Sequence, residues 1–371
     1  MPLLPASWYY PVHLICVSIL SLYASFILSN CDNNRLIAQK KSLNVVYIYA
    51  ILFIIIVGLR PIGAKEFGDS GTYAAVYGAF QRGWLDSSDG LGGDWLWNSF
   101  MFYCSSFLPI NLFFLLVEFL YVFPLIVACK RWSYCNSSLL LLFALGAFSF
   151  FSYGTNGLRN GMACSFAVLA LTYIGGSKKD KLIWAFLCFL AIFNHKSTSL
   201  PIIAMLFTYL YPKPKPMFFF WIGSILISII AGSTVSSFFE SLGFDERMTT
   251  YLDTSDSELF ESFSHSGFRW DFLLYSFMPI LLGWYVLFRR KAEIKLDYML
   301  LLGTYIYSNS FWVMVIRAAY SNRFAYLSWF LYPFVLAYPL LELNIVPNQG
   351  RRLSAIIMIL HLGFTLIMFL R

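Results

Sequence analysis

Charged residues are scarce in this chain of 371 residues, because Asp, Glu, Lys and Arg together make up only 12% of it. A soluble domain usually has about a quarter charged residues, and so few could not cover the surface of a soluble fold this large. Apolar residues account for 59%, and the mean hydropathy is +0.68. Continuous apolar runs recur from end to end, which predicts a polytopic helical membrane protein and excludes a cytosolic enzyme, a disordered chain and alternating barrel strands.

Several motifs that would indicate other chemistry are also missing. The seven cysteines are scattered without a CxxC pair, which gives no sign of a disulfide framework or a zinc site. No Walker A or GxGxxG motif occurs, so ATP-driven transport by this chain alone is not expected. The acids outside the apolar runs form no DxD and show no metal-ligand spacing. We therefore expect no cofactor, no metal and no nucleic-acid partner.

The apolar runs predict an all-α fold with about twelve transmembrane helices in a single membrane domain, residues 1–371. The run at 95–108 is short and ends at Pro109, so we interpret it as a re-entrant or interfacial helix. The predicted spans are 11–29, 44–58, 110–129, 137–152, 158–175, 182–193, 198–211, 217–238, 271–288, 297–315, 324–342 and 353–370.

The segments between the spans alternate between basic and acidic, which predicts the orientation of the chain. One set, which includes 178–181 and 289–295, holds 16 of the 26 Lys and Arg residues and few acids. The positive-inside rule makes this set cytoplasmic. Both termini and the outer segments 60–109 and 239–270 then lie on the opposite side. A full crossing by 95–108 would break this alternation, which supports its interpretation as re-entrant.

Six cations lie at the predicted outer ends of different spans, where snorkelling to the headgroups would be the ordinary explanation. Arg159 follows two glycines and Asn156 at a helix start, where backbone N–H groups, the helix dipole and a guanidinium would bind an anion together. The six cations are Arg60, Arg159, Lys196, Arg269, Arg317 and Arg323.

Two further residues are candidates for proton transfer. His195 lies in the turn NHKSTSLP between two short spans, and a histidine can take up a proton near neutral pH. Asp69 lies in the polar loop FGDSGTY, where it could accept a proton, orient a sugar hydroxyl or pair with an arginine. Each also has a structural interpretation, since a histidine can be a satisfied core residue and a glycine-flanked aspartate often forms an Asx-turn.

These motifs, in their order along the chain, resemble the EpsG-like, Wzy-type polysaccharide polymerases of bacteria. The segment VGLRPIG followed by FGDSGTY is similar to a GLR, GxD and Tyr signature, and TNGLRNG is similar to an Asn-x-x-Arg helix start. The turn FNHKSTSLP and the segment SNRFAYLSWFLYP are similar to the family's His-Lys turn and its C-terminal arginine span. The chain departs from the pattern in a longer stretch between Arg60 and Asp69 and in Asn194, where the family often has an aromatic residue.

The resemblance implies a metal-independent glycosyltransferase with a GT-C-like helical fold in the bacterial inner membrane. Such an enzyme joins undecaprenyl-diphosphate-linked repeat units at the periplasmic face, with donor and acceptor glycan lipids as substrates and a chain-length regulator as a partner. His195 or Asp69 would then be catalytic, and the six outer cations would bind the diphosphate. Sugar contacts would come from Tyr73, Asn156 and Trp95. The interfacial aromatic belt is the ordinary explanation for such a tryptophan.

Three other functions compete with this interpretation. A ligase that transfers glycan to the lipid A core would carry one large outer loop, whereas the outer segments here are of moderate size. A flippase for the lipid-linked unit would need charges reachable from both sides, whereas the informative charges here are predicted to lie outside. A membrane acyltransferase would need a cytoplasmic acyl-CoA site, and the inner segments contain no sign of one.

Overall fold

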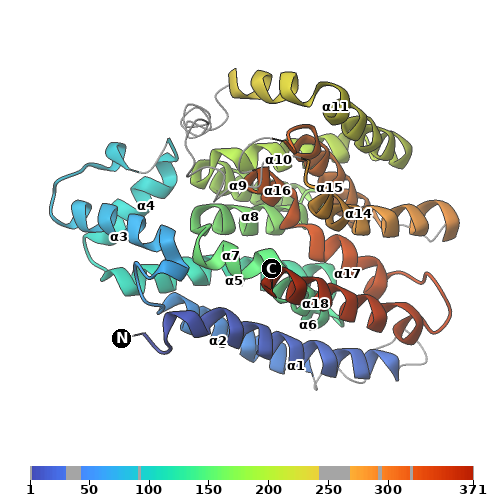
Figure 1. The fold of residues 1–371 in the computed structure, drawn as a ribbon, viewed down its shortest axis with the longest axis horizontal. Coiled ribbons are helices and arrows are strands. Elements are labelled where there is room, and N and C mark those ends of the chain that lie inside the picture. Colours follow the sequence, from blue (N-terminus) through green and yellow to red (C-terminus); the bar gives the residue numbers. More distant parts are fainter. Residues whose placement is uncertain are drawn as a thin grey trace. The chain divides into compact units, whose positions relative to one another are not determined.

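The computed structural model describes residues 2–30, 43–90, 93–241, 268–290, 295–317 and 321–370. Every regular element in these ranges is a helix, as Figure 1 shows. The chain divides into two compact units. The first comprises Met1–Lys196 and Ala337–Arg371, and the second comprises Ser197–Leu336. Most of the predicted outer segment 239–270 lies outside the described residues.

Six helices in the described ranges are long and apolar enough to cross a membrane, and a bent pair at 137–155 would make a seventh. All twelve predicted apolar runs are helical, so the all-α prediction is confirmed. Several of these helices have 12 to 17 residues, which at 1.5 Å per residue is shorter than a hydrocarbon core of about 30 Å. The count of twelve spans and the GT-C-like arrangement therefore remain predictions. The six long segments are Ala6–Ser29, Ile110–Trp132, Pro214–Gly232, Trp270–Arg290, Phe324–Glu342 and Gly350–Leu370.

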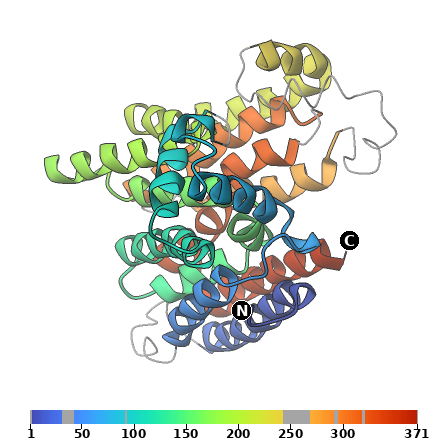
Figure 2. The same cartoon turned by 90° about the vertical axis from the view of Figure 1, so that its left-hand side faces the viewer.

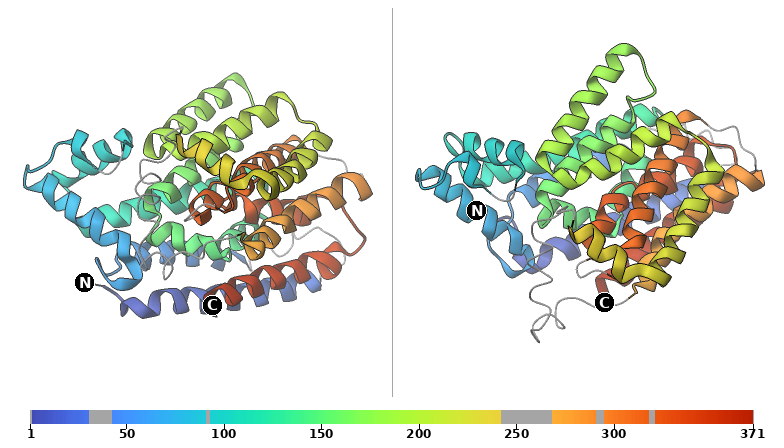
Figure 3. Two further views of the ribbon diagram at one scale, coloured as in Figure 1. Left: turned by 45° about the horizontal axis from the view of Figure 1, so that its top comes forward. Right: turned by 90° about the horizontal axis from the view of Figure 1, so that it is seen from above.

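The first unit is built around α5, which packs against α2 and α8, while α8 packs against α9. Gly58 allows the close approach of α2 to α5, because a Cβ there would lie 2.8 Å from Leu115 Cα. Figures 1 and 3 show α18 beside α1, and Figure 2 shows α3 and α4 lying together. The helices of this unit are α1 (Tyr9–Ser29), α2 (Val45–Gly58), α3 (Gly68–Gln81), α4 (Trp95–Ser105), α5 (Ile110–Trp132), α6 (Ser137–Leu145), α7 (Phe148–Thr155), α8 (Leu158–Leu171), α9 (Lys178–Asn194), much of α17 (Tyr332–Glu342) and α18 (Ala355–Leu370).

A sharp break separates α6 from α7, whose axes differ by 74°. Such a break frees backbone carbonyls, and inside a membrane those carbonyls need partners from the protein. His361 Nε2 contacts Phe143 O at 2.9 Å, and His13 Nε2 contacts Leu145 O at 3.1 Å. Thr365 Oγ1 donates to Gly146 O at 2.7 Å. Side chains from α1 and α18 therefore stabilise the break and fix the direction in which α7 leaves it.

In the second unit, α10 and α11 both pack on α15. Gly303 lets α10 approach α15, since a Cβ there would lie 2.4 Å from the Thr208 side chain. Asn309 accepts from Trp221 Nε1 at 2.8 Å and donates to Ser328 Oγ at 3.1 Å, so one buried amide joins three helices. The helices of this unit are α10 (Ser199–Leu210), α11 (Pro214–Ser241), α14 (Trp270–Trp284), α15 (Leu296–Met314) and α16 (Ser321–Trp329).

The break between α6 and α7 can be tested with Thr365→Val, which keeps the shape of the side chain but removes its hydroxyl. The Gly146 carbonyl then loses its donor, so we expect the free energy of unfolding to fall by about 1–2 kcal/mol. The thermal melting temperature of the purified protein in detergent measures this loss. Thr365→Ser retains the donor and serves as the matched control, and equal melting temperatures for the valine and serine variants would contradict the capping role.

Candidate functional site

The carboxylate of Asp94 collects polar contacts from two other parts of the first unit. Arg159 Nη1 lies 2.8 Å and His195 Nδ1 lies 3.3 Å from Asp94 Oδ2. The backbone N–H of Lys196 donates to Asp94 Oδ1 at 3.0 Å. Asp94 and Arg159 are 6% and 7% exposed, whereas the His195 side chain is 23% exposed. A buried carboxylate therefore holds a guanidinium and an imidazole, and the imidazole remains partly open to the surroundings.

Local structure explains how these residues meet. Arg159 is the second residue of α8, and Gly161 allows α8 to fold back on α7, since a Cβ there would lie 2.7 Å from Tyr153 O. His195 is the C-cap of α9 and has an extended backbone, so the helix ends there and its ring contacts Asp94. Because α8 and α9 are packed together, the beginning of one lies near the end of the other.

Tyr73 connects α3 to the same group of residues. Arg159 Nε donates to the Tyr73 hydroxyl at 3.3 Å, and the Tyr73 ring meets the buried Trp97 ring edge-on at 5.4 Å between centroids. Trp95, which follows Asp94, is 52% exposed and contacts the Phe189 and Phe193 rings of α9. We call Tyr73, Asp94, Arg159, His195 and the Lys196 backbone the Asp94 cluster.

The surroundings of Asp94 favour its charged form. Burial alone would raise the pKa of the carboxyl, but the His195 ring, the Arg159 guanidinium and the Lys196 N–H together lower that pKa below its ordinary value. An ionised carboxylate can only accept hydrogen bonds, so the proton of a neutral His195 ring lies on Nδ1. The lone pair is then on Nε2, where a neutral imidazole acts as a base.

Asp94 is a candidate site residue that the sequence patterns do not identify. Its position directly before an aromatic helix is typical of an N-cap aspartate, which would use its carboxylate on its own helix. In the structure the Asp94 side chain makes no capping bond to α4 and contacts α8 and the end of α9 instead. The available signal is an acid next to the predicted sugar-binding Trp95, in a predicted outer segment that also contains Tyr73.

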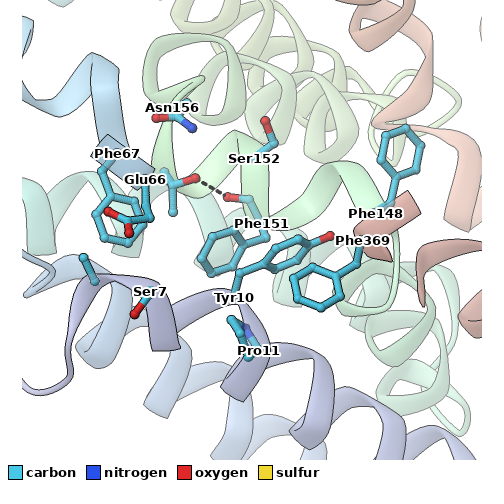
Figure 4. Close-up of a pocket in the computed structure, with 12 residues that line it drawn as sticks. Ser7, Tyr10, Pro11, Glu66, Phe67, Phe148, Phe151, Ser152, Asn156 and Phe369 are labelled. Atoms are coloured by element: carbon cyan, nitrogen blue, oxygen red, sulfur yellow. Dashed lines mark hydrogen bonds between the residues drawn. The ribbon is translucent and has the colours of Figure 1, made fainter. Parts of the chain in front are cut away.

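Two other predicted residues lie apart from these contacts. Asp69 is exposed on the first turn of α3. Asn156 follows α7 and lines a separate cavity of the first unit, shown in Figure 4. Asp69 and His195 are the two predicted alternative bases. A buried carboxylate holds His195, whereas Asp69 is exposed on α3.

Arg60 lies in the interior of the first unit. Its Nη1 lies 3.1 Å from Glu118 Oε1, and both side chains are fully buried. Arg60 also donates to Val57 O at 2.7 Å and to Thr155 O at 3.2 Å. The guanidinium thus joins α2, α5 and the last residue of α7, and no part of its surface is exposed to a ligand.

The remaining predicted cations belong to the second unit. Arg269 forms a two-pronged ion pair with Asp271, with contacts of 3.0 and 2.8 Å. Arg317 is exposed, and its guanidinium carbon lies 5.7 Å from the centre of the Phe268 ring. Arg323 lies in the first turn of α16. Arg269 and Arg317 therefore lie near each other at one end of α14 and α15.

The charge of Asp94 can be tested through the pH dependence of stability. The pKa of Asp94 is lower in the folded state than its unfolded value of 3.8, so the ionised carboxylate stabilises the protein at pH values above 3.8. This stabilisation is lost as the pH falls through the pKa of the folded state. We expect Asp94→Asn to lower the melting temperature at about pH 7 and to lose this disadvantage towards about pH 3. Asp69→Asn, at an exposed acid of α3, is the control and should show no such trend. A constant difference between wild type and Asp94→Asn across the range would contradict the assignment.

Comparison with known proteins adds one finding. Neither a curated protein nor a solved structure gives a significant match to the chain. The EpsG family model matches residues 43–371, a range that includes the whole Asp94 cluster. The chain therefore belongs to the EpsG family.

Proposed function

We propose that this chain is a membrane glycosyltransferase that polymerises undecaprenyl-diphosphate-linked oligosaccharide repeat units. Membership of the EpsG family supports a polysaccharide polymerase role. The observation that carries the reaction is the Asp94 cluster, in which a buried carboxylate holds a partly exposed imidazole. The proposed site faces the periplasm at the bacterial inner membrane, and a chain-length regulator is the proposed protein partner.

His195 is the proposed general base. A sugar hydroxyl of the acceptor attacks the anomeric carbon of the donor, and its proton passes to His195 Nε2. The new glycosidic bond forms as the bond from the anomeric carbon to the diphosphate oxygen breaks, and the diphosphate leaves with the electron pair. Asp94 Oδ2 accepts a hydrogen bond from the His195 ring, with 3.3 Å between Oδ2 and Nδ1, and so stabilises the imidazolium that forms.

Arg159 is proposed to stabilise the leaving diphosphate. Its guanidinium lies beside the proposed base, where it contacts Asp94 and Tyr73, and a guanidinium is well suited to phosphate oxygens. Lys196 is exposed next to the cluster. For Arg269, Arg317 and Arg323, diphosphate binding stays a prediction from the sequence. We assign Arg60 a positioning role instead, because its side chain is enclosed with Glu118.

Trp95 and Tyr73 are proposed to bind sugar, and the transfer reaction is proposed to need no metal ion. Trp95 is exposed and Tyr73 adjoins Arg159, so both can contact a sugar near the base. Among the described residues, no group of three His, Cys, Asp or Glu side chains is arranged to hold a metal ion. The energy of transfer is stored in the sugar–diphosphate bond, and the cations supply the positive charge that stabilises the leaving group.

The base is tested by in vitro polymerisation of a lipid-linked repeat unit with purified His195 variants. General-base assistance is typically worth about 10²–10⁴-fold, so His195→Ala should lower the rate by that factor. His195→Gln should fail as well, because an amide keeps a hydrogen bond but cannot take up the proton. Arg82→Ala, which removes an exposed cation of segment 60–109, is the control with unchanged rate. A near-native rate for His195→Gln would make His195 a positioning residue and Asp69 the next candidate.

The orientation is tested by cysteine labelling of intact cells with a reagent that does not cross the inner membrane. Ser88→Cys and Lys179→Cys introduce probes at two exposed positions. We expect labelling above the native background for Ser88→Cys alone, because 60–109 is the proposed periplasmic segment and 178–181 is basic. Labelling of Lys179→Cys alone would reverse the orientation and contradict a periplasmic site.

A further inference from the structure

A cavity of about 400 Å³ in the first unit lies beside residues that the proposed reaction does not use. It is bounded by the beginning of α1, the segment before α3, most of α7 and the end of α18 (Figure 4). Its volume lies towards the lower end of the range of small-molecule sites, about 300–1,000 Å³. The lining residues are Ala6, Ser7, Tyr10, Pro11, Glu66, Phe67, Phe148, Phe151, Ser152, Thr155, Asn156 and Phe369.

Aromatic rings form much of the wall. Tyr10 stacks on Phe151 with 4.7 Å between ring centroids and meets Phe369 edge-on at 5.1 Å. Figure 4 shows these three rings grouped together, with Glu66, Ser152 and Asn156 placed around them. Flat apolar rings with a few polar groups suit a ligand that has both an apolar face and hydrogen-bonding edges.

The polar lining narrows the choice of ligand. Among the described residues that line the cavity, Glu66 alone is charged, so this lining would repel a diphosphate. The side chains of Ser7, Ser152 and Asn156 also line the cavity, and each carries hydrogen-bonding groups. Such groups favour a ligand with hydroxyl or N–H groups, because polar groups that lose water without gaining a partner are unfavourable. A purely hydrocarbon chain would give these groups no partner.

We infer that this cavity binds a neutral sugar ring of a lipid-linked substrate, an inference that rests on the proposed function. Hydroxyl groups of the sugar would hydrogen-bond to the side-chain amide of Asn156 and donate to the Glu66 carboxylate, while its C–H face would lie against Tyr10 or Phe151. Asn156 is three residues before Arg159, so the turn between α7 and α8 joins the cavity to the Asp94 cluster. The cavity would therefore select an uncharged part of the glycan.

The test measures binding by saturation-transfer difference NMR with the purified full chain in detergent. The probes are methyl glucoside, methyl galactoside, methyl N-acetylglucosaminide and methyl glucuronide. We expect at least one neutral glycoside to bind. Ser7→Trp, at an exposed lining position, should abolish that binding, whereas Thr72→Trp, at an exposed position of α3 outside the cavity, should not.

Two further variants test the polar contacts. Loss of one hydrogen bond in Asn156→Ala should weaken binding of the neutral glycoside by about three- to tenfold. Glu66→Gln should improve glucuronide binding about threefold relative to the neutral glycoside, because a like-charge repulsion is removed. Equal glycoside binding by wild type and Ser7→Trp would overturn the inference. It would also be overturned if no neutral glycoside binds and the cavity instead binds farnesol, with Ser7→Trp abolishing that binding.

The binding readout separates this inference from the proposed polymerase. Cavity-dependent binding of a neutral glycoside by a protein that does not polymerise lipid-linked units would uphold the sugar site and overturn the polymerase proposal. In an active protein, the sugar site requires Asn156→Ala and Ser7→Trp to raise the KM for the lipid-linked substrate with a smaller change in kcat. An unchanged KM in both variants would overturn the sugar site and leave the polymerase proposal intact.

Discussion

The ion pair between Arg60 and Glu118 places two charges in the apolar body of the first unit, and the surrounding helices have to accommodate them. Both side chains are fully buried, with 3.1 Å between Arg60 Nη1 and Glu118 Oε1. Removing one partner from such a pair leaves an uncompensated charge, which typically costs about 3–5 kcal/mol. Gly154 leaves room for the carboxylate, because a Cβ there would lie 3.0 Å from Glu118 Oε2. This pair therefore dictates how closely α5 and α7 approach each other.

The same pair fixes the end of α7, and with it the two places where we propose that substrate binds. Arg60 holds the carbonyl of Thr155, the next residue Asn156 lines the cavity, and Arg159 reaches Asp94. One turn of chain thus sets the spacing between a sugar pocket and a proton acceptor. Reactions between two large substrates depend on such fixed geometry, because misplacement by about 1 Å can cost about a hundredfold in rate. In the proposed reaction, Arg60 and Glu118 would act on this geometry without touching a substrate.

Sequence patterns predicted the helices well, because apolar runs and charged segments report directly on what lipid and water permit. They also predicted Tyr73, Arg159 and His195, which the structure brings together although they come from three helices. Asp94 could not be predicted, because its partners lie 65 and 101 residues away and a local reading assigns it to a helix start. For Arg60 the sequence predicted a ligand contact that the structure does not provide. A cation at the end of a span gives the same sequence pattern whether it binds a ligand or pairs with a buried acid such as Glu118.

We propose that the distribution of charge in the first unit separates sugar recognition from proton and diphosphate chemistry. The cavity has aromatic walls and one acid, which suit the uncharged, hydroxyl-rich part of a glycan lipid. The turn after α9 instead presents an exposed lysine beside a histidine whose carboxylate partner is already neutralised by an arginine. Because Arg159 offsets the charge of Asp94, a phosphate that approaches His195 does not meet a net negative site. A sugar diphosphate contains both chemistries in one molecule, so a chain that binds it needs both kinds of surface within reach of one rigid turn.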